Sequence, residues 1–209
     1  KLGKQAYAFT MPLVLDANGN KFGKSEGNAL WLDVNKTSSY ELYQYLINTD
    51  DCMVEQYLKV FTFLTPEEIM DVVKKHNEEP HLRIGQKTLA REFITDLHGK
   101  EEYEKAVKIS ECLFNGDVKS LNVEDILVGF KDVPHFEVEE NTNILDLLVN
   151  NAVASSKREA REFINSGAIS INGDKIESEE LVITKDMALD SKVLVIRRGK
   201  KKNYIGLIK

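Results

Sequence analysis

The stretch SKREAREFINSGAISINGDKI, residues 156–176, contains the start of a helix, its end and a tight turn in that order. Ser156 and Glu159 have the spacing of a capping box, in which two side chains satisfy free backbone N–H groups at a helix N-terminus. Gly167 suits the left-handed conformation that commonly ends a helix. The Asn-Gly pair at 172–173 stands between two short apolar runs, which is the strongest local signal of a β-hairpin. These residues therefore predict a helix followed by a two-stranded hairpin.

The chain on either side of this stretch extends the prediction. Two further apolar runs, residues 193–196 and 204–208, predict strands separated by a strongly basic turn. On the N-terminal side, Thr142 is expected to cap a short helix with several apolar residues. Helices and antiparallel strands in one short segment indicate that residues 142–209 form a small α+β domain.

Residues 39–129 have helical signals instead. Apolar residues recur at intervals of three and four. The run Thr65-Pro66-Glu67-Glu68 combines an N-cap, a proline at the first helical position and a capping box. Gly99 and Gly116 are placed to end two of the helices. We predict an all-helical domain here, with the apolar stripes forming its core.

Two segments complete the predicted organisation. Residues 130–141 have no clear period, contain Pro134 and collect three glutamates, so we expect a linker between domains. Residues 1–38 contain a short apolar run and a turn-rich loop, which predict a strand and loop at the end of a further domain. The predicted fold class is therefore α for the helical domain, plus a small α+β domain, preceded by a short strand and loop.

The composition is that of an ordinary folded protein, with 42% hydrophobic and 30% charged residues. No apolar run approaches the roughly 20 residues that span a membrane. The first ten residues lack the pattern of a signal peptide. Cys52 and Cys112 form neither a disulfide framework nor a metal-binding pattern, and the four histidines are scattered. We therefore expect a cytoplasmic protein with no membrane association and no metal site.

The net charge of −6 is distributed unevenly along the chain. Residues 142–209 contain 12 Lys and Arg against 9 Asp and Glu, whereas residues 1–141 contain 16 against 25. A basic domain attached to an acidic body is a common footprint of nucleic-acid contact, although a short basic segment is more often only a solvated surface.

The loop K-F-G-K-S, residues 21–25, has the composition of a phosphate-binding loop. It is not a P-loop, because position 18 would have to be glycine and is asparagine. Lys21 and Lys24 can nevertheless offset the charge on a leaving pyrophosphate. Ser25 can donate one hydrogen bond, and Gly23 lets the backbone approach closely. On these residues alone, a solvated lysine-rich loop is the more common alternative.

The predicted helix after Ser156 places Lys157 and Arg161 four residues apart on one face, with Arg158 beside them. Phosphates attract such clusters in a salt-dependent way, and basic residues on a helix and hairpin suit the shape and backbone of folded RNA. The alternative is ordinary helix-surface charge, with Arg158 paired to Glu162. The basic turn adds three further candidates for RNA contact, namely Lys200, Lys201 and Lys202.

The text around the K-F-G-K-S loop, with Asn18-Gly19-Asn20 before it and residues 26–33 after it, resembles the second signature of class I aminoacyl-tRNA synthetases in its tyrosine-specific form. Residues 39–45, 47–51, 61–64, 86–90 and 97–99 are similar to that family's helical anticodon-binding domain. The stretch 156–176 resembles the S-four RNA-binding fold, named after a small-subunit ribosomal protein, which bacterial tyrosyl enzymes carry at the C-terminus. The resemblance covers nearly the whole chain in the right order.

This resemblance implies the C-terminal part of a tyrosine–tRNA ligase that uses ATP with Mg²⁺, acts on tyrosine tRNA and is a homodimer when complete. It implies that Lys24, and Lys21 with it, contact the ATP phosphates, and that residues 142–209 touch the long variable arm of the tRNA. No DNA partner is expected. Two alternatives are a stand-alone S-four RNA-binding protein and a helical interaction protein. The loop and the helical block argue against the first, and the basic C-terminal segment against the second.

The family's first signature, of His-x-Gly-His type, and its tyrosine pocket have no counterpart here, because no histidine has that spacing. We therefore expect that this chain alone does not activate tyrosine and holds no bound cofactor. Two smaller departures concern helix starts or surfaces. The family's usual proline between Ser39 and Tyr40 is absent, and Ile84 stands in place of an acidic residue.

Asp50 and Asp51 follow the first predicted helix and are candidates for anticodon contact. The tyrosine anticodon begins with guanine, whose N1 and N2 atoms are hydrogen-bond donors, and a carboxylate is a fitting acceptor. The alternative is that Asp50 caps the following helix. The two roles are compatible with each other.

Overall fold

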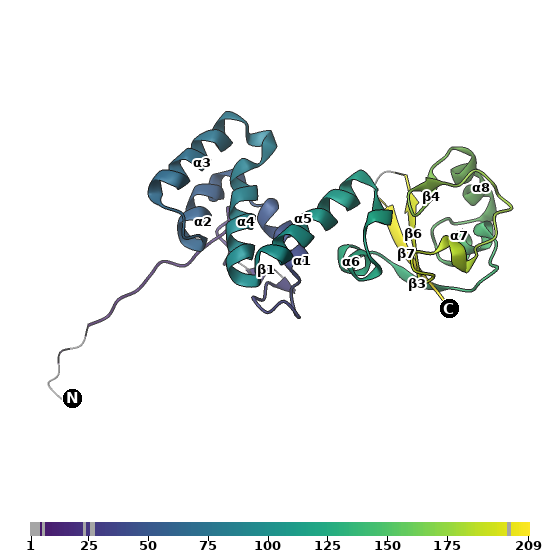
Figure 1. Ribbon diagram of the computed structural model, residues 1–209, viewed down its shortest axis with the longest axis horizontal. Helices are drawn as coiled ribbons and strands as arrows, with labels where there is room; N and C mark the ends of the chain where they lie inside the picture. Colours follow the sequence, from purple (N-terminus) through teal and green to yellow (C-terminus); the bar gives the residue numbers. More distant parts are fainter. Residues whose placement is uncertain (1–4, 6, 23, 26–27, 200–201) are drawn as a thin grey trace. The chain divides into compact units, whose positions relative to one another are not determined.

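The computed structural model describes every residue except 1–4, 6, 23, 26–27 and 200–201 (Figure 1). The chain separates into two compact units, Lys1–Tyr103 and Glu104–Lys209. Each unit contains buried apolar side chains of its own, so each is described by itself.

The first unit is helical because its apolar residues repeat at intervals of three and four and so form one buried stripe on each helix. The buried residues of these stripes include Leu42, Leu46, Leu58, Leu89 and Ile94. The helices are α1 (Ser39–Ile47), α2 (Val54–Phe61), α3 (Pro66–Glu78), α4 (Ile84–His98) and α5 (Lys100–Asn115), of which α5 continues into the second unit; the 3₁₀ turns are η1 (Asp51–Met53) and η2 (Pro80–Leu82).

The predicted capping box at the start of α3 is confirmed. The Thr65 hydroxyl accepts from the backbone N–H of Glu68, and the Glu68 carboxylate accepts from the Thr65 backbone N–H at 2.8 Å. Pro66 occupies the first helical position, where its missing N–H leaves no intrahelical bond unmade. These local bonds fix where α3 begins.

Helices α2, α3 and α4 approach closely at Gly85. A Cβ atom at this position would lie 2.4 Å from Cγ1 of Val54 and 3.3 Å from Cγ of His76. Only glycine leaves room for both side chains against the first turn of α4. This close approach places His76 of α3 next to the segment that connects α1 to α2.

The second unit contains a five-stranded sheet with the strand order β3-β7-β6-β4-β5. The edge strand β3 pairs parallel with β7, whereas the other neighbours pair antiparallel. The strands are β3 (His135–Val138), β4 (Ile169–Ile171), β5 (Asp174–Lys175), β6 (Val193–Arg198) and β7 (Lys202–Ile208); β1 (Lys24–Ser25) and β2 (Asn28–Ala29) form a separate hairpin in the first unit.

Two helices, α7 (Ile144–Asn150) and α8 (Lys157–Asn165), pack on one face of this sheet (Figure 1). Their buried residues share one core with Leu194 and Ile196 of β6. The remaining elements of the unit are α6 (Val123–Gly129), η3 (Val118–Ser120) and η4 (Lys185–Met187). The predicted fold class, helical with a small α+β part, is confirmed.

The turn at 172–173 has the conformation that its sequence predicts. Asn172 and Gly173 both have positive φ angles, of 50° and 91°, between the paired strands β4 and β5. This is the backbone of a tight two-residue hairpin, which asparagine and glycine adopt more readily than other residues. The predicted helix end is also confirmed, because α8 ends at Asn165 and Gly167 has a φ of 65°.

The structure adds an element to one predicted segment and differs from two local predictions. The predicted linker, residues 130–141, contains strand β3, His135–Val138. A four-residue edge strand with charged neighbours has no readable period, and its partner β7 is distant in sequence. Asn143, not Thr142, caps α7. The Glu159 carboxylate accepts from the N–H of Ser155 rather than of Ser156, so the predicted capping box is shifted by one residue on that side.

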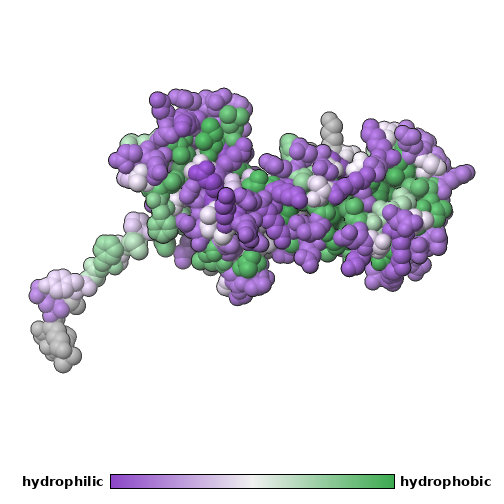
Figure 2. All heavy atoms as spheres, in the orientation of Figure 1, coloured by the Kyte–Doolittle hydropathy of each residue, from purple (hydrophilic) through white to green (hydrophobic). Residues whose placement is uncertain are grey.

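Hydrophilic residues cover most of the surface that Figure 2 presents. The described part of the N-terminal segment extends away from the helices of its unit and exposes Tyr7, Phe9, Met11 and Leu13. Among the described residues, no helix combines the length and apolar character that crossing a membrane requires.

Candidate nucleic-acid interface

The K-F-G-K-S loop is only partly described. Lys21 is exposed, and its backbone bridges to Leu15 across a turn that Asp16 organises. The Asp16 carboxylate accepts from the backbone N–H groups of Asn18 and Asn20 at 2.9 and 2.8 Å. Hydrogen bonding by Asn20 is the largest cause that lowers the pKa of Asp16. Gly23 lies outside the described residues, and for Lys24 and Ser25 the description covers the backbone of β1 alone.

The phenylalanine of this loop packs among aromatic rings of the helices. The Phe22 ring centroid lies 4.6 Å from that of Phe61, 4.9 Å from Tyr57 and 5.4 Å from Tyr45. Phe61 in turn contacts Phe93 of α4, with centroids 5.7 Å apart. Aromatic pairs at these separations contribute roughly 0.5–1.5 kcal/mol beyond their area burial. The candidate phosphate loop is therefore fixed to the helical bundle by Phe22.

A second attachment is made by Tyr57 of α2. Its hydroxyl donates to the backbone oxygen of Leu15 at 2.9 Å, just before the turn. Burial raises the pKa of Tyr57 to about 12, and the nearby charges of Asp16 and Asp50 add to this effect. The sequence places Tyr57 on the core face of its helix but gives no signal of this bond. The aromatic role of Phe22 was missed for the same reason, since neither contact is local.

Asp50 lines a surface hollow of about 470 Å³ in the first unit. Asp50 occupies the position before η1, yet its side chain makes no capping hydrogen bond, so the cap interpretation is not supported by a bond. The hollow combines carboxylates, amides and aromatic rings, which are groups that suit the edge and the face of a nucleobase. Its lining includes Asp16, Gln44, Tyr45, Asn48, Asp50 and Tyr57.

Asp51, the first residue of η1, points toward other partners. Its Oδ1 atom accepts from Nε2 of Gln86 at 2.7 Å and lies 3.3 Å from Nε2 of His76. Gln86 is fully buried in α4 and His76 is nearly so in α3. The two neighbouring aspartates therefore have different surroundings, which their sequence did not distinguish.

The three predicted cations of α8 all lie on the surface, and each is paired with a carboxylate. Lys157 contacts Asp146 of α7 at 2.5 Å, and the predicted alternative pair of Arg158 with Glu162 is present at 3.2 Å. The side chain of Arg158 is 89% exposed. Surface ion pairs of this kind contribute about 0–1 kcal/mol, so a phosphate can displace the carboxylates.

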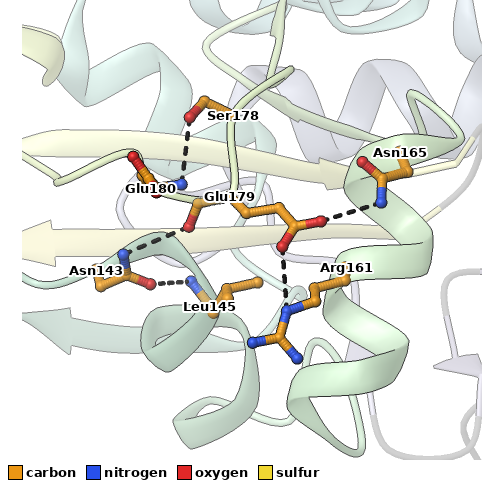
Figure 3. A network of polar contacts seen from close by, with 7 residues as sticks. All are labelled: Asn143, Leu145, Arg161, Asn165, Ser178, Glu179 and Glu180. Atoms are coloured by element: carbon orange, nitrogen blue, oxygen red, sulfur yellow. Dashed lines mark hydrogen bonds and ion pairs between the residues drawn. The ribbon is translucent and has the colours of Figure 1, made fainter.

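Arg161 belongs to a larger polar network (Figure 3). Its Nε atom donates to Glu179 at 3.0 Å, and the second carboxylate oxygen of Glu179 accepts from Asn165 at 3.0 Å. Figure 3 shows both α8 side chains pointing toward the Glu179 carboxylate. Glu179 thus ties the segment after β5 to α8, and Arg161 has a structural contact as well as a surface position.

The basic turn is described at one of its three predicted lysines. Lys202 begins β7 and is exposed, whereas Lys200 and Lys201 lie outside the described residues. Arg198, which precedes the turn, was not singled out from the sequence. Its guanidinium lies 5.2 Å from the centroid of the Phe163 ring, and it donates to the backbone oxygen of Val153. These contacts join the end of β6 to α8 and to the segment before it.

No group of three or more His, Cys, Asp or Glu side chains that could hold a metal ion occurs among the described residues. Cys52 and Cys112 are free thiols.

Two models of known protein families together match most of this chain. A model of the tRNA synthetases class I (W and Y) matches residues 1–115. The chain belongs to this family. A model of the tyrosine–tRNA ligase SYY-like C-terminal domain matches residues 125–206. The expected resemblance to the C-terminal region of bacterial-type tyrosyl-tRNA synthetases is thereby confirmed.

Two relatives show the extent of the similarity. The tyrosine–tRNA ligase of Streptococcus agalactiae serotype Ia is 48% identical over 202 residues, which are 96% of this chain and 48% of the relative. That of Streptococcus thermophilus is 46% identical over 207 residues, 98% of this chain and 50% of the relative. The chain thus spans about half the length of the curated relatives it matches.

Among solved structures, the solution structure of a tyrosyl-tRNA synthetase C-terminal domain aligns with 44% of this chain and 95% of its own, at 39% identity and a TM-score of 0.39.

Proposed function

We propose that this chain is the tRNA-binding part of a tyrosine–tRNA ligase and supplies one ATP-handling loop to its active site. The observation that carries this proposal is the order of the two family matches, a class I synthetase over residues 1–115 and a tyrosine-specific C-terminal domain over residues 125–206. The first match argues against a stand-alone S-four RNA-binding protein, because such a protein has no need of the synthetase segment.

The proposed division of labour follows four segments. Residues 1–38 end the catalytic domain, 39–129 bind the anticodon, 130–141 connect the domains and 142–209 bind the variable arm of the tRNA. The strand within 130–141 joins the sheet of the last segment, so this connection is partly ordered.

In the complete ligase, ATP and tyrosine form tyrosyl-adenylate and release pyrophosphate. We assign to Lys21 and Lys24 the binding of ATP phosphates, and to Gly23 and Ser25 close approach and one hydrogen bond. Ammonium groups that meet the charge growing on the leaving pyrophosphate act mainly on the transition state. ATP as its Mg²⁺ complex is the substrate form that the family implies. The attachment of Phe22 to the helices supports a defined position for Lys21.

The anticodon is assigned to the first unit, with Asp50 and Asp51 as acceptors for guanine. The hollow beside Asp50 and the exposed carboxylate of Asp51 support this assignment. The variable arm is assigned to Lys157, Arg158 and Arg161, together with the turn lysines Lys200, Lys201 and Lys202. Two contacts on one tRNA raise the overall affinity even when each contact is weak, because the second binding event becomes intramolecular.

Tyrosine tRNA is accordingly the proposed partner, and the complete ligase is proposed to be a cytoplasmic homodimer. The test is a pair of assays on the chain as it stands. It should retain tyrosine tRNA in a binding assay and give no tyrosine-dependent exchange of pyrophosphate into ATP. Exchange above the blank would show that the chain has its own tyrosine site. Loss of tRNA binding would remove the proposed role.

A further inference from the structure

The segment Thr49–Asp51 is held against α4 by one buried side chain. The Nε2 atom of Gln86 donates to the backbone oxygen of Thr49 at 3.1 Å and to Oδ1 of Asp51 at 2.7 Å. Both N–H bonds of the amide are thereby used. Turning the amide over would place its carbonyl against two acceptors, so its orientation is fixed.

His76 of α3 lies beside the same carboxylate. Its side chain is 3% exposed, and Nε2 lies 3.3 Å from Oδ1 of Asp51. The glycine at position 85 allows this placement, because a Cβ there would lie 3.3 Å from Cγ of His76. Two buried side chains from two helices therefore converge on one oxygen of Asp51.

This arrangement leaves buried polar atoms without hydrogen bonds. Both ring nitrogens of His76 and the Oε1 atom of Gln86 have no hydrogen-bond partner in the described part of the chain. A buried polar atom without a partner destabilises the fold by about 1–3 kcal/mol. For Gln86, this loss offsets part of what its two hydrogen bonds contribute to stability.

The other end of Asp51 is open. The side chain is 63% exposed, and within the described ranges Oδ2 makes neither a hydrogen bond nor an ion pair. Oδ1 is anchored, whereas Oδ2 has no polar partner among the residues that the structure describes. Asp50 differs, because its side chain has no capping bond to hold it. A carboxylate fixed before binding loses less rotational freedom when a ligand arrives.

We infer that Gln86 is a positioning residue that holds Asp51 as the acceptor for the two donors of guanine, N1–H and N2–H, while His76 packs beside the same carboxylate oxygen. The inference rests on the proposed anticodon role of the first unit and assigns that role to Asp51 rather than Asp50. A planar carboxylate accepts both donors side by side, as it accepts from other paired N–H groups. Loss of the Gln86 amide frees the carboxylate to rotate and weakens this recognition.

The probe is an RNA hairpin with the tyrosine anticodon stem and loop, made with guanine or with inosine at the first anticodon position. Inosine lacks only the 2-amino group. The full chain should bind the guanine hairpin about tenfold more tightly, the effect of one hydrogen bond to a charged group. Gln86→Met, of similar volume, should bring this ratio close to one. The matched control Gln56→Met removes an exposed amide from α2 and should leave the ratio unchanged.

Asp51→Asn provides a second variant, because its exposed side chain is replaced by one of equal size. It should also abolish the ratio, and the double variant Gln86→Met with Asp51→Asn should lose nothing more. If Gln86→Met weakens binding of both hairpins equally and keeps the ratio, Gln86 only supports the fold and the inference is wrong. An unchanged ratio in Asp51→Asn overturns it regardless of how Gln86→Met folds.

The parent chain separates this inference from the proposed function. If the parent does not distinguish guanine from inosine, or binds neither hairpin, the anticodon assignment fails and the inference fails with it. If the parent distinguishes them and Asp50→Asn abolishes the difference while Asp51→Asn does not, the anticodon assignment stands and the inference alone is wrong.

Discussion

Replacing Lys157, Arg158 and Arg161 together by alanine should flatten the salt dependence of tRNA binding. Each phosphate neutralised by a cation changes the slope of log K against log salt by about 0.7–0.9. Three contacts correspond to a slope change of roughly 2 to 3. Between 50 and 200 mM salt the parent should therefore lose about 20- to 40-fold more affinity than the triple variant.

The ion pairs of α8 compete with RNA phosphates for the same cations. Each of the three cations is paired with a carboxylate that a phosphate must displace, and such pairs contribute about 0–1 kcal/mol. Removing a competing carboxylate should therefore tighten binding. Glu162→Gln, which releases Arg158, should raise the affinity at low salt by up to about fivefold. The triple variant and Glu162→Gln thus change affinity in opposite directions at one surface.

The assay is a binding titration of tyrosine tRNA at four or more salt concentrations. The matched control is the alanine triple variant of Lys119, Lys192 and Lys209, which removes the same charge from exposed positions of the same unit outside α8. Lys119 and Lys209 are also in carboxylate pairs, with Asp174 and Glu137. If the α8 variant and the control give parallel salt slopes, α8 is not the RNA-binding surface, and the turn lysines become the next candidates.

Three further predictions concern the first unit. In the complete ligase, Lys24→Ala should slow adenylate formation about a hundredfold through kcat, because a lost charged donor costs roughly 3 kcal/mol at the transition state. Single-turnover kinetics measure this rate. An unchanged rate would mean that the loop is only a solvated, lysine-rich surface. Tyr57→Phe, which leaves the Leu15 oxygen unpaired, should lower the free energy of unfolding by about 1 kcal/mol at pH 7. Because the folded pKa of Tyr57 is raised to about 12, its contribution to the free energy of unfolding is complete below pH 10 and declines toward pH 12. In denaturant titrations over that window, the parent should therefore lose stability more steeply with pH than the variant. Equal dependence on pH in the two proteins would contradict this. Thr65→Ala should lower the free energy of unfolding in urea by about 1 kcal/mol, because it removes the N-cap hydroxyl of α3. An unchanged free energy of unfolding would show that this hydroxyl does not stabilise the helix.

Local signals in the sequence predicted most of the elements. The start of α3 at Thr65 and Pro66, the turn at Asn172 and Gly173 and the end of α8 were predictable because each depends on residues within a few positions of one another. Such features follow from capping and turn chemistry, which act over short stretches of chain.

Contacts between distant residues could not be predicted in this way. Strand β3 forms only because residues 135–138 meet β7, some 70 positions later. Phe22 was part of the quoted loop, yet its aromatic neighbours lie on α1 and α2. The anchoring of Asp51 by Gln86 joins residues 35 positions apart. Periodicity gives the face on which a residue lies, but not its partner across the core.

The residues of the candidate site also divide into those that the sequence predicted and those that only the structure reveals. The cations of α8 could be identified because their charge and spacing are visible in the sequence. Their carboxylate partners, apart from Glu162 at four positions from Arg158, come from other elements and appear only in the structure. Charge counts therefore located the candidate RNA surface but overstated how unbalanced its charge is.

We propose that two modules of this chain bind two places on one tRNA. The most direct measurement is the affinity of the chain for four tyrosine tRNAs: intact, with a shortened variable arm, with inosine at the first anticodon position, and with both changes. Each single change should weaken binding, and the two losses in free energy should add to within about 0.5 kcal/mol in the doubly changed tRNA. Equal affinities for all four tRNAs would contradict this proposal.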